Sequence, residues 1–296
     1  MFATIGAAGK IGYSTSFMLR EAGVPVRAIL RDPAKASQLS AIGCEVALAD
    51  LQDAAALGKA IAGAHAVQII CPVAPKAQDA VADMHRSIES MAQALEQARP
   101  DLVLAISDYG AHVEEDIGMP TMFHGFEERL RQLDMPKVFL RSAEHMEGWA
   151  RVIPVAVATG ILPSFHHPVE KPFPNVSARD VGVIAADLLL HPKAGMSEQI
   201  VHAEGPRRYS AADVAAAVSQ LLGRTVTAQA VPRSQWAEGL GRVVSASIVP
   251  LLTGVYDAHS RGGLIDVEVG RGDVRYGTTE LIEALRPYVP LGANGN

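Results

Sequence analysis

The chain is short of cysteine: Cys44 and Cys71 are the only two in 296 residues. Neither belongs to a CxxC motif or to a Cys/His cluster, which argues against a disulfide framework and against a structural zinc site. The adjacent His166 and His167 lack further ligands at zinc-site spacing, so we expect a loop there and no metal. Two isolated thiols fit a reducing compartment and predict a cytoplasmic protein.

Positive charge and long apolar runs are also scarce. With a net charge of −6 and a pI near 5.9, the chain has no overall basic field to attract a nucleic-acid backbone, and we expect no direct nucleic-acid partner. The longest apolar stretch, residues 149–165, contains Arg151, Pro154 and Pro163. Since it falls short of the roughly 20 apolar residues that cross a bilayer, we expect no membrane segment.

Apolar residues nevertheless make up 49% of the chain, which suits helices packed on a buried parallel sheet. In the first half, short apolar runs alternate with helical stretches, as in successive βαβ units. This order predicts an α/β fold with a Rossmann-type, doubly wound parallel sheet of at least six strands. The expected strands are 2–5, 25–30, 45–49, 66–70, 102–106 and 137–141, and the expected helices are 11–22, 33–42, 53–61, 78–98 and 123–133.

The second half has a looser pattern, with prolines at 154, 163, 168, 172 and 174. Helices are expected at 177–190 and 210–222, and a strand at 226–231. We therefore predict two parts: a nucleotide-binding Rossmann domain over residues 1–145, to which 175–192 returns, and a smaller α/β substrate-binding lobe over residues 146–296.

Glycines at GxxGxxG spacing lie between the first expected strand and helix, at Gly6, Gly9 and Gly12. The first permits a tight turn, the second lets a pyrophosphate approach the backbone, and the third lets the helix pack closely. The helix N-terminus then faces the phosphates. The loop predicts a dinucleotide site that includes the remaining residues of the segment, Ala8, Lys10 and Ile11.

The end of the second strand bears on the choice of dinucleotide. Arg31 is placed to pair with a 2′-phosphate, with Lys10 and Lys35 as supporting cations, and this predicts NADP(H). Asp32 could instead accept from a ribose hydroxyl, so NAD(H) stays open. The ends of the next two strands are expected beside the cofactor, where Asp50 and Leu51 would flank the adenine and Cys71 and Pro72 would lie along the dinucleotide.

Taken together, these segments resemble the NmrA-like branch of the atypical short-chain dehydrogenases/reductases. The resemblance rests on residues 6–12, 30–33, 49–51 and 107–111, on His124 with Glu128, and on Leu140-Arg141, and it covers about residues 1–190. It implies NAD(P)H binding. The branch contains NAD(P)H-dependent reductases, quinone reductases among them, and also regulators that sense the nicotinamide pool without turning it over.

The usual proton-transfer pair of the superfamily, Tyr-x-x-x-Lys, is missing from this chain. At the corresponding place His124 and Glu128 lie one helical turn apart, so the imidazole could act as an acid oriented by the carboxylate, or the pair could be an ordinary surface contact. Tyr109 is expected near the nicotinamide or a substrate carbonyl, and Ser107 is expected to anchor the loop. Both could also merely shape the turn.

His145, Met146 and Trp149 are expected to line the region between the two parts and to touch a small-molecule substrate. Three functions remain open on these residues. The first is an NADPH-dependent oxidoreductase that reduces a small carbonyl or quinone-type acceptor. The second is a non-catalytic NAD(P)H redox sensor or transcriptional regulator acting through a protein partner, and the third, a sugar-nucleotide epimerase, is disfavoured by the missing Tyr/Lys pair. A homodimer is also open.

Overall fold

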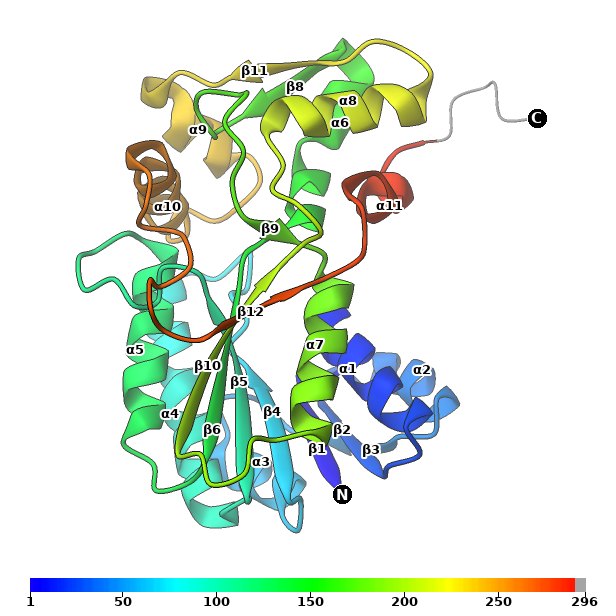
Figure 1. Cartoon of the computed structure of the whole chain (residues 1–296), viewed down its shortest axis with the longest axis vertical. Coiled ribbons are helices and arrows are strands. Elements are labelled where there is room, and N and C mark those ends of the chain that lie inside the picture. Colours follow the sequence, from blue (N-terminus) through cyan, green and yellow to red (C-terminus); the bar gives the residue numbers. More distant parts are fainter. Residues whose placement is uncertain (291–296) are drawn as a thin grey trace.

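A computed structural model describes residues 1–290 as a parallel sheet flanked by helices, with a smaller lobe above it (Figure 1). Eight strands form the sheet in the order β12-β10-β6-β5-β4-β1-β2-β3, and every neighbouring pair is parallel. The strands are β1 (Phe2–Ile5), β2 (Val26–Leu30), β3 (Glu45–Leu48), β4 (Ala66–Ile70), β5 (Leu102–Asp108), β6 (Lys137–Ser142), β10 (Glu198–Glu204) and β12 (Asp273–Tyr276).

Helices cover both faces of this sheet, so its central strands are buried on both sides and read as continuous apolar runs. One apolar core joins the sheet to α1 (Lys10–Glu21) and α7 (Ala178–Leu190), beside which lies α2 (Ala36–Ala41). The other core joins it to α3 (Ala54–Ile61), α4 (Ala80–Ala98) and α5 (Met119–Arg131).

Local capping explains where several helices begin. Asp53 and Asp79 accept hydrogen bonds from the backbone N–H groups of the first turns of α3 and α4. Ser210 forms a capping box with Asp213 at the start of α8 (Ala211–Leu222). Helix α5 begins at Met119 and not at the predicted residue 123, because its proline falls in the first turn, where a missing N–H costs nothing.

The smaller lobe is built from the second half of the chain and has its own apolar core. Strands β8 (Ile161–Ser164) and β11 (Thr227–Ala230) pair in it, and β7 (Glu144–His145) pairs with β9 (Asn175–Val176) where the lobe joins the sheet. Its helices are α6 (Ile153–Thr159), α8, α9 (Trp236–Gly241), α10 (Val249–Arg261) and α11 (Leu281–Leu285), with short 3-10 turns η2 (Met146–Arg151), η3 (Arg233–Gln235) and η4 (Arg286–Tyr288). A further 3-10 turn, η1 (Pro33–Lys35), follows β2 in the sheet domain.

The fold agrees with the predicted Rossmann-type sheet, and it has two strands that the sequence did not predict. Residues 198–204 and 273–276 had been assigned to the lobe, but they pair beside β6 at the edge of the sheet. The outermost strand, β12, reads Asp-Val-Arg-Tyr and lacks an apolar run, because an exposed edge does not require one. Within residues 1–290, no helix is both long and apolar enough to cross a membrane.

Helix α7 returns to the sheet and packs directly on α1. A Cβ added at Gly182 would lie 2.5 Å from the Cβ of Ser14 and 2.6 Å from the carbonyl oxygen of Ile11. The Ser14 hydroxyl also donates to the carbonyl of Arg179 at 2.8 Å. This contact holds the start of α1, and therefore the glycine loop, in a fixed position.

Candidate cofactor site and the adjoining interlobe cluster

The glycine loop connects β1 to α1 as the sequence predicts. Gly6 has a φ of +75°, a left-handed conformation that favours glycine, and an added Cβ would lie 2.5 Å from Ile70. Gly9 caps α1 without any side-chain hydrogen bond to the helix. The backbone N–H groups of the first turn therefore have no capping side chain, which is the arrangement that binds phosphate at a helix N-terminus.

The three glycines have different roles in the structure. An added Cβ at Gly12 would lie 2.4 Å from the Gly6 carbonyl oxygen and 2.8 Å from the Cα of Ala7, so the loop itself needs this position bare. At Gly9 the closest atom would be 3.3 Å away, and the residue is exposed. Gly9 therefore leaves an open face toward which a pyrophosphate can approach. Ala8 is half-buried beside it and Ile11 is buried.

Lys10 contacts a residue that the sequence did not connect with the loop. Its ammonium donates to the hydroxyl of Tyr288 and lies 4.6 Å from the centre of that ring. Tyr288 belongs to η4, near the other end of the chain. The C-terminal part of the lobe thus reaches the predicted phosphate site, and no local pattern in the sequence could have indicated it.

Arg31 and Lys35 are both exposed beyond the end of β2. Between them, Asp32 caps the following turn, because its carboxylate accepts a hydrogen bond from the N–H of Ala34 at 3.0 Å. This contact engages one oxygen of the Asp32 carboxylate and leaves the other able to accept from a ribose hydroxyl. Arg31 and Asp32 are thus both exposed at the end of β2, where a cofactor could contact either.

The ends of β3 and β4 lie beside the loop at the same edge of the sheet. Asp50 accepts a hydrogen bond from the N–H of Gln52 at 2.9 Å, and Leu51 is half-buried. Burial raises the pKa of the Cys71 thiol to about 12, so this side chain is neutral and inert. The following residue, Pro72, is exposed.

At the end of β5, Ser107 and Tyr109 point into the protein. The Ser107 hydroxyl donates to Glu127 at 2.6 Å. Tyr109 is fully buried and donates to Glu204 at 3.2 Å, and burial raises its pKa, reinforced by that carboxylate. The structure therefore gives Tyr109 an interior position and not the predicted place beside a nicotinamide, because its ring fills the core next to His202.

Asp108 lies between these two residues, and the sequence did not single it out. Burial, together with the nearby Glu144 carboxylate, raises the pKa of Asp108 to about 8. The carboxyl group therefore keeps its proton around neutral pH.

His124 and Glu128 do not pair with each other. The Nδ1 atom of His124 lies 2.9 Å from the carbonyl oxygen of Ala111, and Glu128 accepts a hydrogen bond from Arg131 at 2.7 Å. The prediction that Glu128 orients the His124 imidazole is wrong, and the ring contacts a backbone carbonyl instead. The neighbouring Glu127, which the sequence did not select, is fully buried.

His145, Met146 and Trp149 follow β6 where the lobe joins the sheet. His145 is half-buried, and its Nε2 lies 3.0 Å from the Ser142 hydroxyl. Burial lowers its pKa, against the opposing effect of the Glu147 and Glu144 carboxylates. Met146 is fully buried in the core of the lobe, whereas Trp149 lines a cavity.

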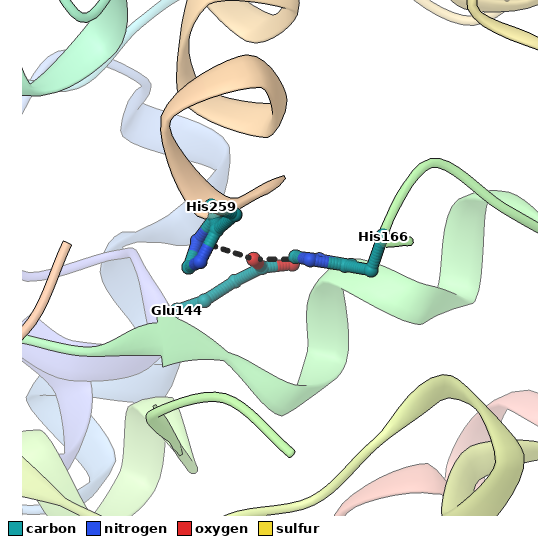
Figure 2. Close-up of side chains that lie close together, drawn as sticks. All are labelled: Glu144, His166 and His259. Atoms are coloured by element: carbon teal, nitrogen blue, oxygen red, sulfur yellow. Dashed lines mark ion pairs between the residues drawn. The ribbon is translucent and has the colours of Figure 1, made fainter. Parts of the chain in front are cut away.

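Glu144, His166 and His259 gather at the same junction, as Figure 2 shows. The Glu144 carboxylate lies 3.0 Å from Nε2 of His166 and 3.7 Å from Nε2 of His259. Burial alone would raise the pKa of Glu144, but the two imidazoles outweigh it and lower the pKa to about 2. Burial, reinforced by His166, lowers the pKa of His259 to about 4.

Two small cavities adjoin this group. One, of about 30 Å³, is lined by Glu144, Trp149 and His166 among others. The second, of about 130 Å³, is lined by His166, His259 and Arg208 among others. The carboxyl end of the sheet thus has a phosphate-type loop on one side and a polar, partly hollow junction with the lobe on the other.

A parallel sheet with an uncapped glycine loop after its first strand defines a Rossmann-type, dinucleotide-binding class of protein. Comparison of sequences places the chain within that class, because the profile of the NmrA-like family matches residues 2–257. The chain belongs to the NmrA-like family.

Two curated relatives cover most of the chain. NAD(P)H azoreductase of Xenophilus azovorans is 26% identical over 236 residues, which are 79% of this chain and 78% of that protein. Quinone oxidoreductase 2 of Escherichia coli is 24% identical over 269 residues, 90% of each chain. Among solved structures, the NADP(H) complex of Citrobacter sp. triphenylmethane reductase superposes with a TM-score of 0.79 at 19% identity, covering 98% of this chain and 100% of that one.

Proposed function

We propose that this protein is an NADPH-dependent oxidoreductase that reduces a small conjugated acceptor of the quinone or carbonyl type. The observation that carries the proposal is the exposed Gly9 at the uncapped N-terminus of α1, with Arg31 exposed at the end of the neighbouring strand. NADPH, when bound, supplies the hydride. The relatives named for azo and quinone substrates support an acceptor that takes up hydride readily.

The proposed cofactor site follows the carboxyl edge of the sheet. The first turn of α1 binds the pyrophosphate, and Arg31 and Lys35 pair with the 2′-phosphate. Asp50 and Leu51 flank the adenine, and Cys71 and Pro72 line the path of the dinucleotide. Because Lys10 contacts Tyr288, cofactor binding also involves the C-terminal part of the lobe.

The proposed acceptor site is the junction between sheet and lobe, beside His145 and Trp149. Met146 supports this site from the lobe core, and Tyr109 holds the β5 loop in place through its bond to Glu204. His124 is the proposed proton donor, positioned by the Ala111 carbonyl. A quinone accepts hydride without a strong acid, since solvent can protonate the reduced product, so positioning supplies much of the catalysis.

The test is a direct assay. Purified protein is mixed with NADPH and a panel of quinones, azo dyes and aldehydes while the absorbance of the reduced nicotinamide is followed. We expect acceptor-dependent oxidation of NADPH. If no acceptor is reduced, but NADPH changes the oligomeric state or the binding of a protein partner, the protein is a redox sensor. The absence of the Tyr-x-x-x-Lys pair is consistent with that alternative.

A homodimer and a cytoplasmic location also belong to this proposal. Both cysteines are buried and free, which suits a reducing compartment. Sedimentation with and without NADPH measures the oligomeric state.

A further inference from the structure

Three side chains from distant parts of the chain converge at the junction between sheet and lobe (Figure 2). Glu144 is supplied by β7, His166 by the loop after β8, and His259 by the last turns of α10. Each presents one nitrogen or carboxylate oxygen, and these three atoms lie within 4.8 Å of one another. Two imidazoles and one carboxylate meeting at one point form a typical donor set for a transition-metal ion.

The contact inside this group is not an ordinary hydrogen-bonded pair. His166 is 4% exposed, and its Nε2 lies 3.0 Å from the Glu144 carboxylate, but the two groups are poorly aligned for a hydrogen bond. A buried ring nitrogen that is only poorly aligned with its partner keeps part of the cost of leaving water. The cost is removed when the nitrogen's lone pair is directed at an ion lying beside the carboxylate oxygen.

We propose that Glu144, His166 and His259 bind a divalent metal ion of the Zn²⁺, Co²⁺ or Ni²⁺ type. Imidazole nitrogen suits these ions, and a single carboxylate adds one negative charge, whereas Mg²⁺ and Ca²⁺ prefer sites made entirely of oxygen. The site is separate from the dinucleotide loop. Its existence does not depend on the proposed reductase activity.

The distances are compatible with such an ion. With bonds of about 2.0 to 2.1 Å, two tetrahedral ligands lie about 3.4 Å apart. The two separations from Glu144, 3.0 and 3.7 Å, bracket that value. The two imidazole nitrogens, which lie within 4.8 Å of each other, have to approach through a small rotation of the His259 side chain.

The surroundings favour three protein ligands with further positions left open. The ring of His166 stacks on Phe173, with 3.8 Å between ring centres, which fixes its orientation. One cavity is lined by Glu144 and His166, and the other by His166 and His259. Water or a small anionic ligand entering from either cavity would complete the coordination, as in open sites that hold three protein ligands.

The experiment uses the full chain without an affinity tag, stripped with a chelator and titrated with Zn²⁺ by calorimetry. Co²⁺ provides a second readout, because its visible absorption reports tetrahedral or five-coordinate binding. We expect one ion per chain. Removing a ligand, in His166→Gln, His259→Ala or Glu144→Gln, should weaken Zn²⁺ binding by more than about 100-fold, a larger loss than is typical for second-shell residues.

The matched control is His191→Ala. His191 lies on the surface, with Nδ1 3.0 Å from Asp187, so it represents the background binding of an exposed His/carboxylate pair. This variant should keep the full affinity. Circular dichroism of each variant checks that it folds, and the three ligand variants provide independent tests if one does not.

The proposal is overturned if the wild-type chain binds no Zn²⁺, or if folded ligand variants bind Zn²⁺ as tightly as the wild type. In either case the three side chains form only a buried ion pair with a neighbouring imidazole. NADPH oxidation measured on the same samples is a separate readout, so a failed reductase assay leaves the binding result intact.

Discussion

Arg141 and Glu127 form a doubly hydrogen-bonded pair in the interior of the protein. The guanidinium donates to the two carboxylate oxygens at 2.8 and 2.7 Å, and both side chains are at most 2% exposed. Arg141 also donates to Glu268 at 2.5 Å, and Ser107 donates to Glu127. The pair therefore ties β5, β6, α5 and the loop before β12 together beneath the proposed active site.

Breaking this pair should destabilise the fold. In Glu127→Ala the guanidinium of Arg141 stays buried with only part of its charge balanced, and we expect a loss of about 3–5 kcal/mol in the free energy of unfolding. Urea unfolding measures it. Glu128→Ala is the control, because that carboxylate is exposed and should change stability by less than about 1 kcal/mol. Equal effects of the two variants would contradict this assignment.

Arg31 should set the preference for NADPH over NADH. A charge-assisted bond to the 2′-phosphate is worth about 1.5–3 kcal/mol, which corresponds to roughly a 10- to 150-fold difference in affinity. Calorimetry on Arg31→Ala should find NADPH and NADH bound with almost equal affinity. Lys59→Ala, which removes an exposed positive charge from α3, is the control and should keep the preference for NADPH. Equal binding of both cofactors by the wild-type protein would rule out NADP(H) specificity.

Gly9 and Gly12 should respond differently to the same substitution. In Gly9→Val the added Cβ meets only the Gly6 carbonyl oxygen, at 3.3 Å, a milder contact than at Gly12, but the side chain fills the space of the pyrophosphate. We therefore expect a nearly normal circular dichroism spectrum and a loss of NADPH affinity of more than about tenfold. Gly12→Val places a side chain against the Gly6 carbonyl and should cost roughly 1–3 kcal/mol or more of stability. Retained affinity in Gly9→Val would mean that the phosphates bind elsewhere.

His202 should make the protein sensitive to acid. Burial, reinforced by Arg141, lowers the pKa of His202 from 6.5 to about 4. The unfolded chain therefore binds the proton more readily, so the stabilising contribution is complete above pH 6.5 and is lost as the pH falls toward 4. Unfolding measured across this window should show a smaller slope in His202→Gln, which can still accept from the Glu268 N–H. An unchanged slope would exclude His202 as the source.

His124→Ala tests the proposed proton donor. If the imidazole donates a proton in the transition state, kcat should fall by about 10²–10⁴ while NADPH affinity stays the same. Glu128→Gln should have little effect, because Glu128 is held by Arg131. A change of less than about tenfold in His124→Ala would assign the proton to solvent.

The sequence alone was enough for the alternating strands and helices of residues 2–141, the glycine loop and the family. These features are local: a GxxGxxG spacing, a period of apolar residues and a capping aspartate act within a few residues of one another. Gly6, Gly9 and Gly12 lie where their spacing indicated.

Tertiary structure decided which polar side chains meet. Glu127 and Glu128 are adjacent in the sequence, but neighbours on a helix point about 100° apart, so one is buried against Arg141 and the other is exposed. Tyr288 contacts Lys10 because the C-terminal part of the lobe folds back onto the sheet. The same packing of lobe on sheet brings together the cluster of Glu144, His166 and His259. Such contacts depend on the packing of segments far apart in the chain, and no periodicity or motif records that packing.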